Sequence, residues 1–332
     1  MDCLTSSRHS AALAVAERFC AYAAKSTDPA DGPIGDRLIG VALLALGDLE
    51  GARRHIERML GRYVARRSHI IRFQYDQRLL AHSYHALILW LLGFADQAMR
   101  SIECNLVDAR ASDHPVSLSS ALSFACPVAL LAGDLTLAER YIKALMDRSA
   151  RHALELWSVV GHCFEGVLLV KRGNIGAGLE LLRTAFTRVP QNALSLLYTP
   201  FLAEIADALG RGGKAAEGLS IIDEALARSE RNEEHWYIAE LLRIKGELIL
   251  REGAPQAAMA AEEHFLRSLD GARRQGALSW ELRTSTSLAR LQHDQGRIAE
   301  ARNLLQPVYD RFSEGFETPD LKTAKAYLNF SP

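Results

Sequence analysis

The sequence is poor in cysteine, in aromatic residues and in unbalanced charge. Its 332 residues include five cysteines, an odd and scattered set, which excludes a disulfide framework and is typical of reduced thiols in the cytoplasm. No apolar run reaches the roughly 18 residues that a membrane span needs, and no N-terminal segment has the order of a signal peptide. We therefore expect a cytoplasmic protein that does not bind membranes.

The balance of charge argues against nucleic acid as a direct partner. Lys and Arg number 39 and Asp and Glu number 40, for a formal charge of −1, so no basic excess is available to neutralise a phosphate backbone. One basic cluster stands beside aromatic residues that could stack on bases; it comprises Arg62, Arg66, Arg67, His69 and Arg72. A solvated loop between repeats is the interpretation that the charge balance favours.

Motifs that carry catalysis are missing. The nearest approach to a phosphate-binding loop, residues 210–215, lacks the first glycine at the right offset and has Ala215 where a hydroxyl must bind magnesium. His82 and His85 stand three apart on one predicted helix, but no third metal donor lies near them in the sequence. We therefore predict a protein that is not an enzyme and that holds no metal and no cofactor.

The sequence does contain a recurring glycine. Seven times a glycine ends one apolar helical stretch, and a small residue five to eight positions later opens the next. These marker glycines are Gly47, Gly93, Gly133, Gly173, Gly213, Gly253 and Gly296. Their spacings are 46, 40, 40, 40, 40 and 43 residues. A period in this range, with two helices per unit, is typical of a helical solenoid.

The second unit illustrates how each hairpin forms. Apolar residues recur every three or four positions over residues 77–92, as on a helix with one buried stripe, and Gly93 supplies the left-handed residue that ends this helix. Ala98 then lies where the two antiparallel helices are predicted to approach most closely. In every unit a bulky residue follows four positions after the small one: Ile56, Ile102, Ile142, Leu182, Ile222, Phe265 and Leu305.

We predict an all-α solenoid of about seven tetratricopeptide-like hairpins with a C-terminal capping helix and no sheet. It forms a single domain over residues 1–332, with a leading helix and loop at 1–33, the repeats at 34–313 and the cap at 314–332. Thr318 suits the N-cap of the last helix, Pro319 its first position and Asp320 its first turn. A solenoid needs such a helix to cover its last apolar face.

The units fit the tetratricopeptide pattern loosely, because they keep its glycine, small and bulky residues but run to 40 residues rather than about 34. This longer period resembles the tetratricopeptide-like (MalT-like) region of maltose-regulon activators. A closer resemblance rests on HWYIAELLRIKGELIL (235–250), on residues 273–328 and most specifically on EGFETPDLKTAK (314–325). There the chain is similar to the C-terminal helical-repeat region of bacterial multidomain signalling ATPases, winged-helix transcriptional regulators and nucleotide cyclases. The resemblance implies a sensor or regulatory module whose output lies in other domains, and it leaves open whether the chain is an excised fragment.

Candidate binding residues lie on the first helix of each hairpin, which lines the concave face of such a superhelix. Counting back from the marker glycines places six polar or charged residues of the last two units on that face. They are Glu240, Arg243, Glu247, Arg283, Thr286 and Arg290. This stripe could clasp a polar peptide or a small effector. Simple pairs three and four residues apart along a solvated helix are the interpretation that such charge runs favour.

The four tryptophans also fall on first helices. Trp90 is embedded in LILWLL and is predicted to lie in the core. Trp157 and Trp236 sit near helix starts, at the rim, where an aromatic side chain can be half exposed. These two are candidates for binding, although packing is favoured for each.

Two functions stay open at this point. The first is a non-enzymatic regulatory or sensor repeat domain, which binds a small effector or a partner protein on its concave face for a signalling or transcriptional regulator. The second is a scaffold that docks peptides or neighbouring domains without a small ligand. Homo-oligomers are compatible with both.

Overall fold

The computed structural model describes residues 8–62, 71–72, 74–190 and 195–329. These residues form sixteen α-helices, a short 3₁₀ helix and two short strands. The helices up to the middle of the chain are α1 (His9–Ala23), α2 (Asp31–Leu46), α3 (Leu49–Arg62), α4 (Gln77–Leu91), α5 (Ala95–Ala111), α6 (Pro115–Ala132), α7 (Leu135–Arg151) and α8 (Glu155–Lys171). The remaining elements are α9 (Ile175–Phe186), α10 (Ser195–Arg211), α11 (Ala215–Asn232), η1 (His235–Tyr237), α12 (Ile238–Glu252), α13 (Ala257–Gln275), α14 (Leu278–Asp294), α15 (Ile298–Tyr309) and α16 (Pro319–Asn329).

The predicted architecture is confirmed. A leading helix, α1, is followed by seven antiparallel hairpins from α2–α3 to α14–α15 and by α16. All seven marker glycines adopt the left-handed conformation, with φ between 72° and 94°, which a side chain would make unfavourable. The first hairpin begins at Asp31, three residues before the boundary that we expected, because Pro33 fits within the first turn of α2.

One expectation was wrong in detail, since the chain contains a small sheet. The strands β1 (Ile71–Arg72) and β2 (Tyr75–Asp76) pair antiparallel between α3 and α4. Gln74 takes the left-handed conformation, φ 71°, at the turn between them. Four residues in a tight hairpin leave no alternating pattern for the sequence to reveal. Most of the basic cluster around this connection, residues 63–70, lies outside the described residues.

Small side chains on both helices of a hairpin allow their close approach. A Cβ atom on Gly178 of α9 would lie only 2.7 Å from the carbonyl oxygen of Gly166 on α8. The first helices all carry a small residue seven positions before the marker glycine: Gly40, Ala86, Cys126, Gly166, Ala206, Gly246 and Ala289. Ala98, on the second helix of its unit, is fully buried, and the predicted bulky residues are at most 3% exposed.

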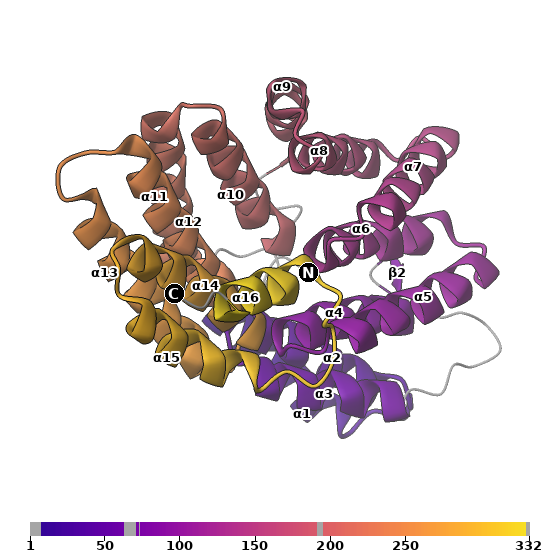
Figure 1. Cartoon of the computed structure of the whole chain (residues 1–332). Coiled ribbons are helices and arrows are strands. Elements are labelled where there is room, and N and C mark those ends of the chain that lie inside the picture. The colour runs from indigo at the N-terminus through magenta and orange to yellow at the C-terminus, as the bar shows by residue number, and fades with distance from the viewer. Residues whose placement is uncertain (1–7, 63–70, 73, 191–194, 330–332) are drawn as a thin grey trace.

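The superhelix turns back on itself after five units (Figure 1). The turn glycine of the first unit, Gly47, faces Gln275 at the end of the sixth. Gly93 of the second unit faces Leu278 of the seventh, and Gly133 of the third unit faces Pro319 of α16, where an added Cβ would lie 2.2 Å from the proline ring. The last helices therefore pack against the early ones, and the N- and C-terminal thirds of the chain lie side by side.

The segment before α16 fastens this closure. Glu314 accepts hydrogen bonds from the backbone N–H (2.9 Å) and the side chain (3.1 Å) of Gln97 on α5. The backbone N–H of Gly315 donates to Asp96 at 3.1 Å. Helix α16 itself packs Leu321 and Leu328 against the apolar face of α14 and α15, as predicted for a cap. The stretch 314–325 thus both covers the last repeat and joins it to the second.

Helix α6 is long and apolar enough to span a membrane by length and composition, contrary to our expectation. However, 72% of that stretch is buried inside the structure, as for a central helix of a packed core. Its inner neighbours α4 and α8 belong to the same continuous hydrophobic core.

We predict that Ala98→Phe lowers the free energy of unfolding by about 1–3 kcal/mol, because the ring would force α4 and α5 apart. Urea denaturation followed by circular dichroism measures the change. Val107→Phe on the same helix is the control, since Val107 is 63% exposed and its replacement should change stability by less than about 0.5 kcal/mol. Equal midpoints for the two variants would show that Ala98 does not mark the helix crossing.

Candidate functional site

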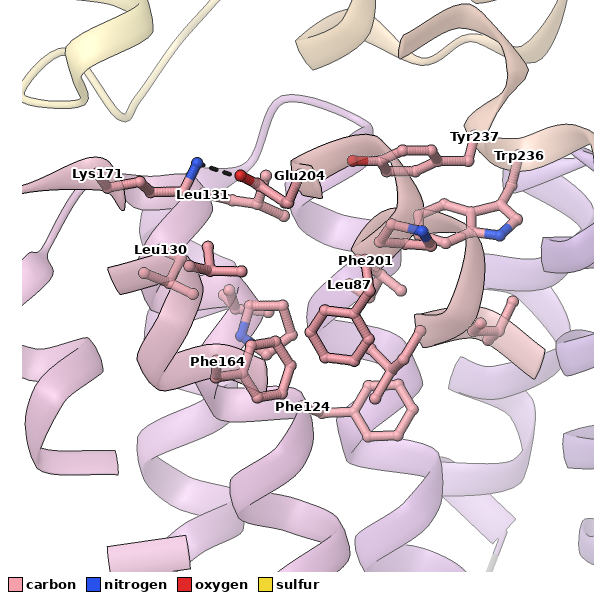
Figure 2. A pocket seen from close by; sticks show the side chains of 16 residues that line it. Leu87, Phe124, Leu130, Leu131, Phe164, Lys171, Phe201, Glu204, Trp236 and Tyr237 are labelled. Atoms are coloured by element: carbon pink, nitrogen blue, oxygen red, sulfur yellow. Dashed lines mark ion pairs between the residues drawn. The ribbon is translucent and has the colours of Figure 1, made fainter. Parts of the chain in front are cut away.

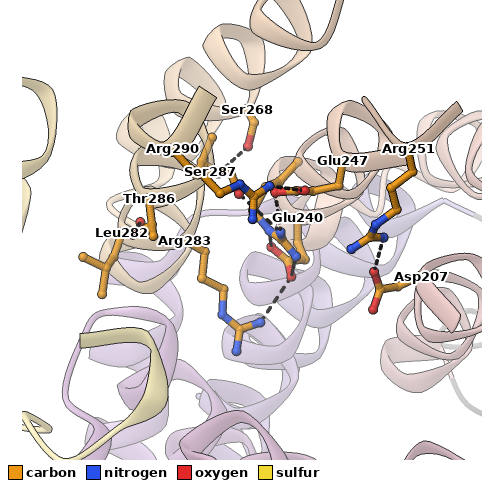
Figure 3. Close-up of polar contacts among 12 residues, drawn as sticks. Asp207, Glu240, Glu247, Arg251, Ser268, Leu282, Arg283, Thr286, Ser287 and Arg290 are labelled. Atoms are coloured by element: carbon orange, nitrogen blue, oxygen red, sulfur yellow. Dashed lines mark hydrogen bonds and ion pairs between the residues drawn. The ribbon is translucent and has the colours of Figure 1, made fainter. Parts of the chain in front are cut away.

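The six candidates lie on α12 and α14, and ion pairs join the five charged ones on the inner face (Figure 3). Glu240 lies at their centre and is only 2% exposed. Its carboxylate accepts hydrogen bonds from Arg243 at 2.7 and 2.8 Å and from Arg283 of the next first helix at 3.2 Å. Although burial favours the neutral acid, the two arginines hold the pKa of Glu240 below its ordinary value.

The pairs three and four residues apart that we expected on a solvated helix are therefore present but buried. Glu247 pairs with Arg290 of α14 and lies 3.8 Å from Arg243. The hydroxyl of Thr286 donates to the carbonyl of Leu282 in its own helix at 2.8 Å. Among the ion-paired candidates, Arg290 has the most exposed side chain, with 41% of its surface accessible.

Arg283 is occupied by the closure of the superhelix. Besides Glu240, it pairs with Asp320 of α16 at 2.7 Å. Its guanidinium lies 5.1 Å from the ring centre of Trp90 on α4 and 5.2 Å from that of Trp280. The two indole rings contact each other edge to face at 4.9 Å. Arg283 thus joins four helices from both ends of the chain, which indicates a structural role for it.

Ion pairs continue along the inner face between successive first helices. Lys171 of α8 pairs with Glu204 of α10 at 3.0 Å, and Asp207 of α10 pairs with Arg251 of α12 at 2.9 Å. Together with the pairs from α12 to α14 and from α14 to α16, they form what we call the ion-pair ladder. Each charged side chain in the ion-pair ladder has a partner of opposite charge on a neighbouring helix, so the ladder stabilises the spacing of neighbouring repeats.

Neither Trp157 nor Trp236 is half exposed at a rim, and the packing that was favoured for each is what the structure shows. Trp157 is 7% exposed and packs in the main core. Trp236, in η1, is 3% exposed, because the closing superhelix brings α2 against η1. Trp236 nevertheless lines a pocket on the inner face, whereas Trp157 does not.

The pocket lies among the first helices α4, α6, α8 and α10, with η1 as one wall (Figure 2). The space between its side chains, counted with its open mouth, is about 610 Å³. Phe124, Phe164 and Phe201 form its floor, and the Phe164 and Phe201 rings are 4.9 Å apart. The ion pair of Lys171 and Glu204 lies at its edge. An apolar concave surface with few polar groups is the usual form of a ligand site.

Sequence reasoning missed the pocket, although a signal existed. Phe124 and Phe164 stand 40 residues apart, each nine positions before its marker glycine. Six positions before the marker glycines, the residues change from apolar in the first four units to charged in the last three. In order they are Val41, Leu87, Pro127, Val167, Asp207, Glu247 and Arg290. The inner face is therefore apolar in its first half and charged in its second.

A buried carboxylate lies directly behind the pocket wall. Glu234 is 1% exposed and accepts hydrogen bonds from the hydroxyl of Thr199 at 2.9 Å and the indole N–H of Trp236 at 3.3 Å. Burial raises its pKa to about 7, against the smaller opposing effects of Thr199, Arg228 and Trp236. The acid therefore changes its charge near neutral pH beside a pocket residue.

A second buried charge lies at the other end of the inner face. Arg37 of α2 is 5% exposed, and its Nε donates to the Gln77 side chain at 2.9 Å. Within the described part of the chain, this is its one hydrogen bond, and no carboxylate pairs with it. Burial lowers the pKa of the Arg37 guanidinium, against a smaller effect of the nearby Tyr84.

In the part of the chain that the structure describes, no three His, Cys, Asp or Glu side chains converge as metal ligands. His82 and His85 do not form such a group. Burial lowers the pKa of His82 to about 4, so this imidazole is neutral at physiological pH.

No protein-family model matches the chain, and a search of curated proteins gives no match. Among solved structures, the chain is similar to the Rap conjugation gene regulator of plasmid pLS20 in complex with the Phr* peptide. The TM-score is 0.64 at 10% identity, over 91% of this chain and 78% of that one. It is also similar to Cut9 in the APC/C hetero-tetramer Cut9–Hcn1, with a TM-score of 0.59 at 14% identity, over 97% and 52% of the two chains.

A third similar structure is a signal transduction ATPase with numerous domains that has a tetratricopeptide repeat sensor, from Pyrococcus horikoshii. Its TM-score is 0.50 at 13% identity, over 95% of this chain and 52% of that one. At these identities the likeness concerns the fold. The predicted tetratricopeptide-like helical-repeat region is thereby confirmed.

We predict that Arg283→Met lowers the free energy of unfolding by about 2–4 kcal/mol, because it leaves the buried Glu240 with one arginine fewer and Asp320 unpaired. Arg290→Met is the matched control, since Arg290 is partly exposed and pairs with Glu247 alone in the ladder. Its loss should be about 1 kcal/mol or less. Equal losses in urea denaturation would contradict the role of Arg283 in closure.

The raised pKa of Glu234 predicts a pH dependence of stability. Its pKa in the folded state is about 7 against an ordinary 4.5, so the folded protein binds the proton more tightly than the unfolded chain does. Its contribution to stability is present below pH 4.5 and is lost as the pH rises through 7. We expect a loss on the order of 1–3 kcal/mol between pH 5 and pH 8.

Comparison with Glu234→Gln isolates this effect. Urea midpoints of the wild type should fall relative to those of the variant over that pH range. Parallel pH profiles for the two proteins would show that Glu234 does not titrate there.

Proposed function

We propose that the chain is a regulatory protein-interaction repeat domain that binds a peptide segment on its inner face. The observation that supports this most is the aromatic-floored pocket, which joins an apolar half of the inner face to a charged half. Such a surface fits an extended peptide with apolar side chains at one end and polar groups at the other. The domain itself would be non-catalytic and would act in the cytoplasm.

The comparisons support a peptide as the occupant. The Rap regulator to which the chain is similar was solved with the Phr* peptide, and Cut9 with a protein partner. The similarity to a signalling ATPase with a repeat sensor agrees with the sequence resemblance to multidomain regulators. In such a parent protein, peptide binding on the repeats would pass to an output domain.

A small effector in the same pocket is the second candidate, because an aromatic floor with a single ion pair at its edge is the mostly apolar lining that small-molecule sites have. The ion-pair ladder favours a peptide over such an effector as occupant. A peptide can lie along the ladder and the pocket together, whereas a small apolar molecule uses the pocket alone. Arg290 and Trp236 remain our candidates for direct contacts.

The proposal is tested by selecting displayed random dodecamer peptides on the immobilised chain and titrating the enriched peptides by fluorescence anisotropy. We expect enrichment of Leu, Phe, Ile and Met. Leu131→Glu places a charge on a partly buried pocket residue and should weaken binding about tenfold or more. Val107→Glu on the outer face is the control and should change nothing.

Peptides that bind equally well to the wild type and to Leu131→Glu would contradict the proposed site. If no peptide is enriched, while a metabolite raises the thermal midpoint of the wild type but not of Leu131→Glu, the small-effector function would replace it.

A further inference from the structure

Among the described residues, Arg37 is a buried cation that no carboxylate pairs with. It lies on the first helix of the first unit, ten positions before Gly47. Gln77 accepts a hydrogen bond from it, and the Tyr84 phenol lies near enough to interact with it electrostatically; burial raises the pKa of the Tyr84 phenol so that it stays neutral. A guanidinium carries five N–H donors, of which the described chain engages one.

The sixth unit shows how an arginine at the same position of the repeat is neutralised. Arg243 also stands ten positions before its marker glycine, with Glu240 three residues earlier and Glu247 four residues later. Both carboxylates lie within ion-pair distance of it, and despite burial they raise its pKa above the ordinary value. In the first unit the two equivalent positions hold Ile34 and Val41.

Burying a charge without a partner is strongly unfavourable. Replacing a buried unpaired arginine by an apolar residue of similar length would therefore stabilise the free protein. A ligand that supplied the missing anion would offset this cost.

The position of Arg37 also connects it with the pocket. Tyr84, beside Arg37, contacts Phe124 of the pocket floor edge to face at 5.0 Å. Helix α2, which carries Arg37, packs against η1, and Trp236 and Tyr237 of η1 form a wall of the pocket. Arg37 thus stands at the apolar end of the inner face, where the ion-pair ladder does not reach.

We propose that Arg37 binds a carboxylate of the peptide whose apolar side chains occupy the pocket. The proposal rests on the proposed function and fixes where the peptide lies, with its carboxylate near the first unit and its polar remainder along the ion-pair ladder. The carboxylate can come from the C-terminus of the peptide or from an Asp or Glu side chain. Arg243 and Arg283 are already neutralised by Glu240, so Arg37 is the arginine of the inner face that attracts an anion.

The first test needs no ligand. Arg37→Met should leave the urea midpoint of the full chain unchanged or raise it, whereas Arg243→Met, the matched control, should lower it because Glu240 and Glu247 each lose one of their two arginines. If Arg37→Met instead lowers the midpoint as much as Arg243→Met does, Arg37 is a structural residue and the proposal is overturned. This outcome does not depend on whether any peptide binds.

The second test uses the peptides enriched by display, titrated against the wild type, Arg37→Met and Arg37→Lys. Each peptide is compared as free acid, as C-terminal amide and with each Asp or Glu replaced by its amide. Removal of the recognised carboxylate should weaken binding to the wild type about tenfold or more. The same removal should have no effect on Arg37→Met, since the partner is already gone, and Arg37→Lys should lie between them.

The C-terminal amide and the side-chain amides distinguish the two sources of the carboxylate, because only the peptide that lacks the recognised carboxylate should lose affinity. Peptides that depend on Leu131 but bind Arg37→Met as tightly as the wild type would overturn the assignment to Arg37 while leaving the proposed function intact. Absence of peptide binding would count against the proposed function, and the stability comparison would still decide whether Arg37 is structural.

Discussion

The close packing of the two helices in each hairpin is the constraint on which the rest of the structure depends. Gly166 and Gly178 bring the backbones of α8 and α9 so near that either Cβ would meet main-chain atoms, and alanine, glycine or cysteine takes these places in the other units. Because every unit repeats this contact at nearly the same spacing, each is rotated on its neighbour by a similar amount. The superhelix therefore returns to its start after five units, and its closure follows from the repeated packing of small residues.

Closure divides the inner face into two regions with different chemistry. In the later units, charges are matched between neighbouring first helices, and Glu240, Arg243 and Arg283 are neutralised inside the protein. In the earlier units the same register holds apolar side chains, and these leave a pocket floored by Phe124, Phe164 and Phe201. The charged residues thus hold neighbouring repeats together, whereas the aromatic residues form the floor of the proposed peptide site.

The sequence allowed the local part of this structure to be predicted, because each hairpin is specified by residues near one another in the chain. A marker glycine, a small residue five to eight positions later and a bulky residue four beyond it recur in every unit, and all of them lie where the pattern placed them. The closure could not be predicted in this way. Contacts such as Trp90 with Trp280, or Gly133 with Pro319, depend on the accumulated twist of five units. For the same reason the sequence could not show what Trp236 packs against, because α2, about two hundred residues away in the sequence, contacts η1 only after closure.

The contact between the second and seventh units also changes how the chain should lose its structure. An open solenoid is linked only between neighbours, so its ends can fray one repeat at a time while the middle stays folded. Here the terminal repeats are the ones that hold each other, through Glu314 with Gln97 and through the paired indoles. Neither end can detach without exposing the other, and the array should melt as one cooperative unit.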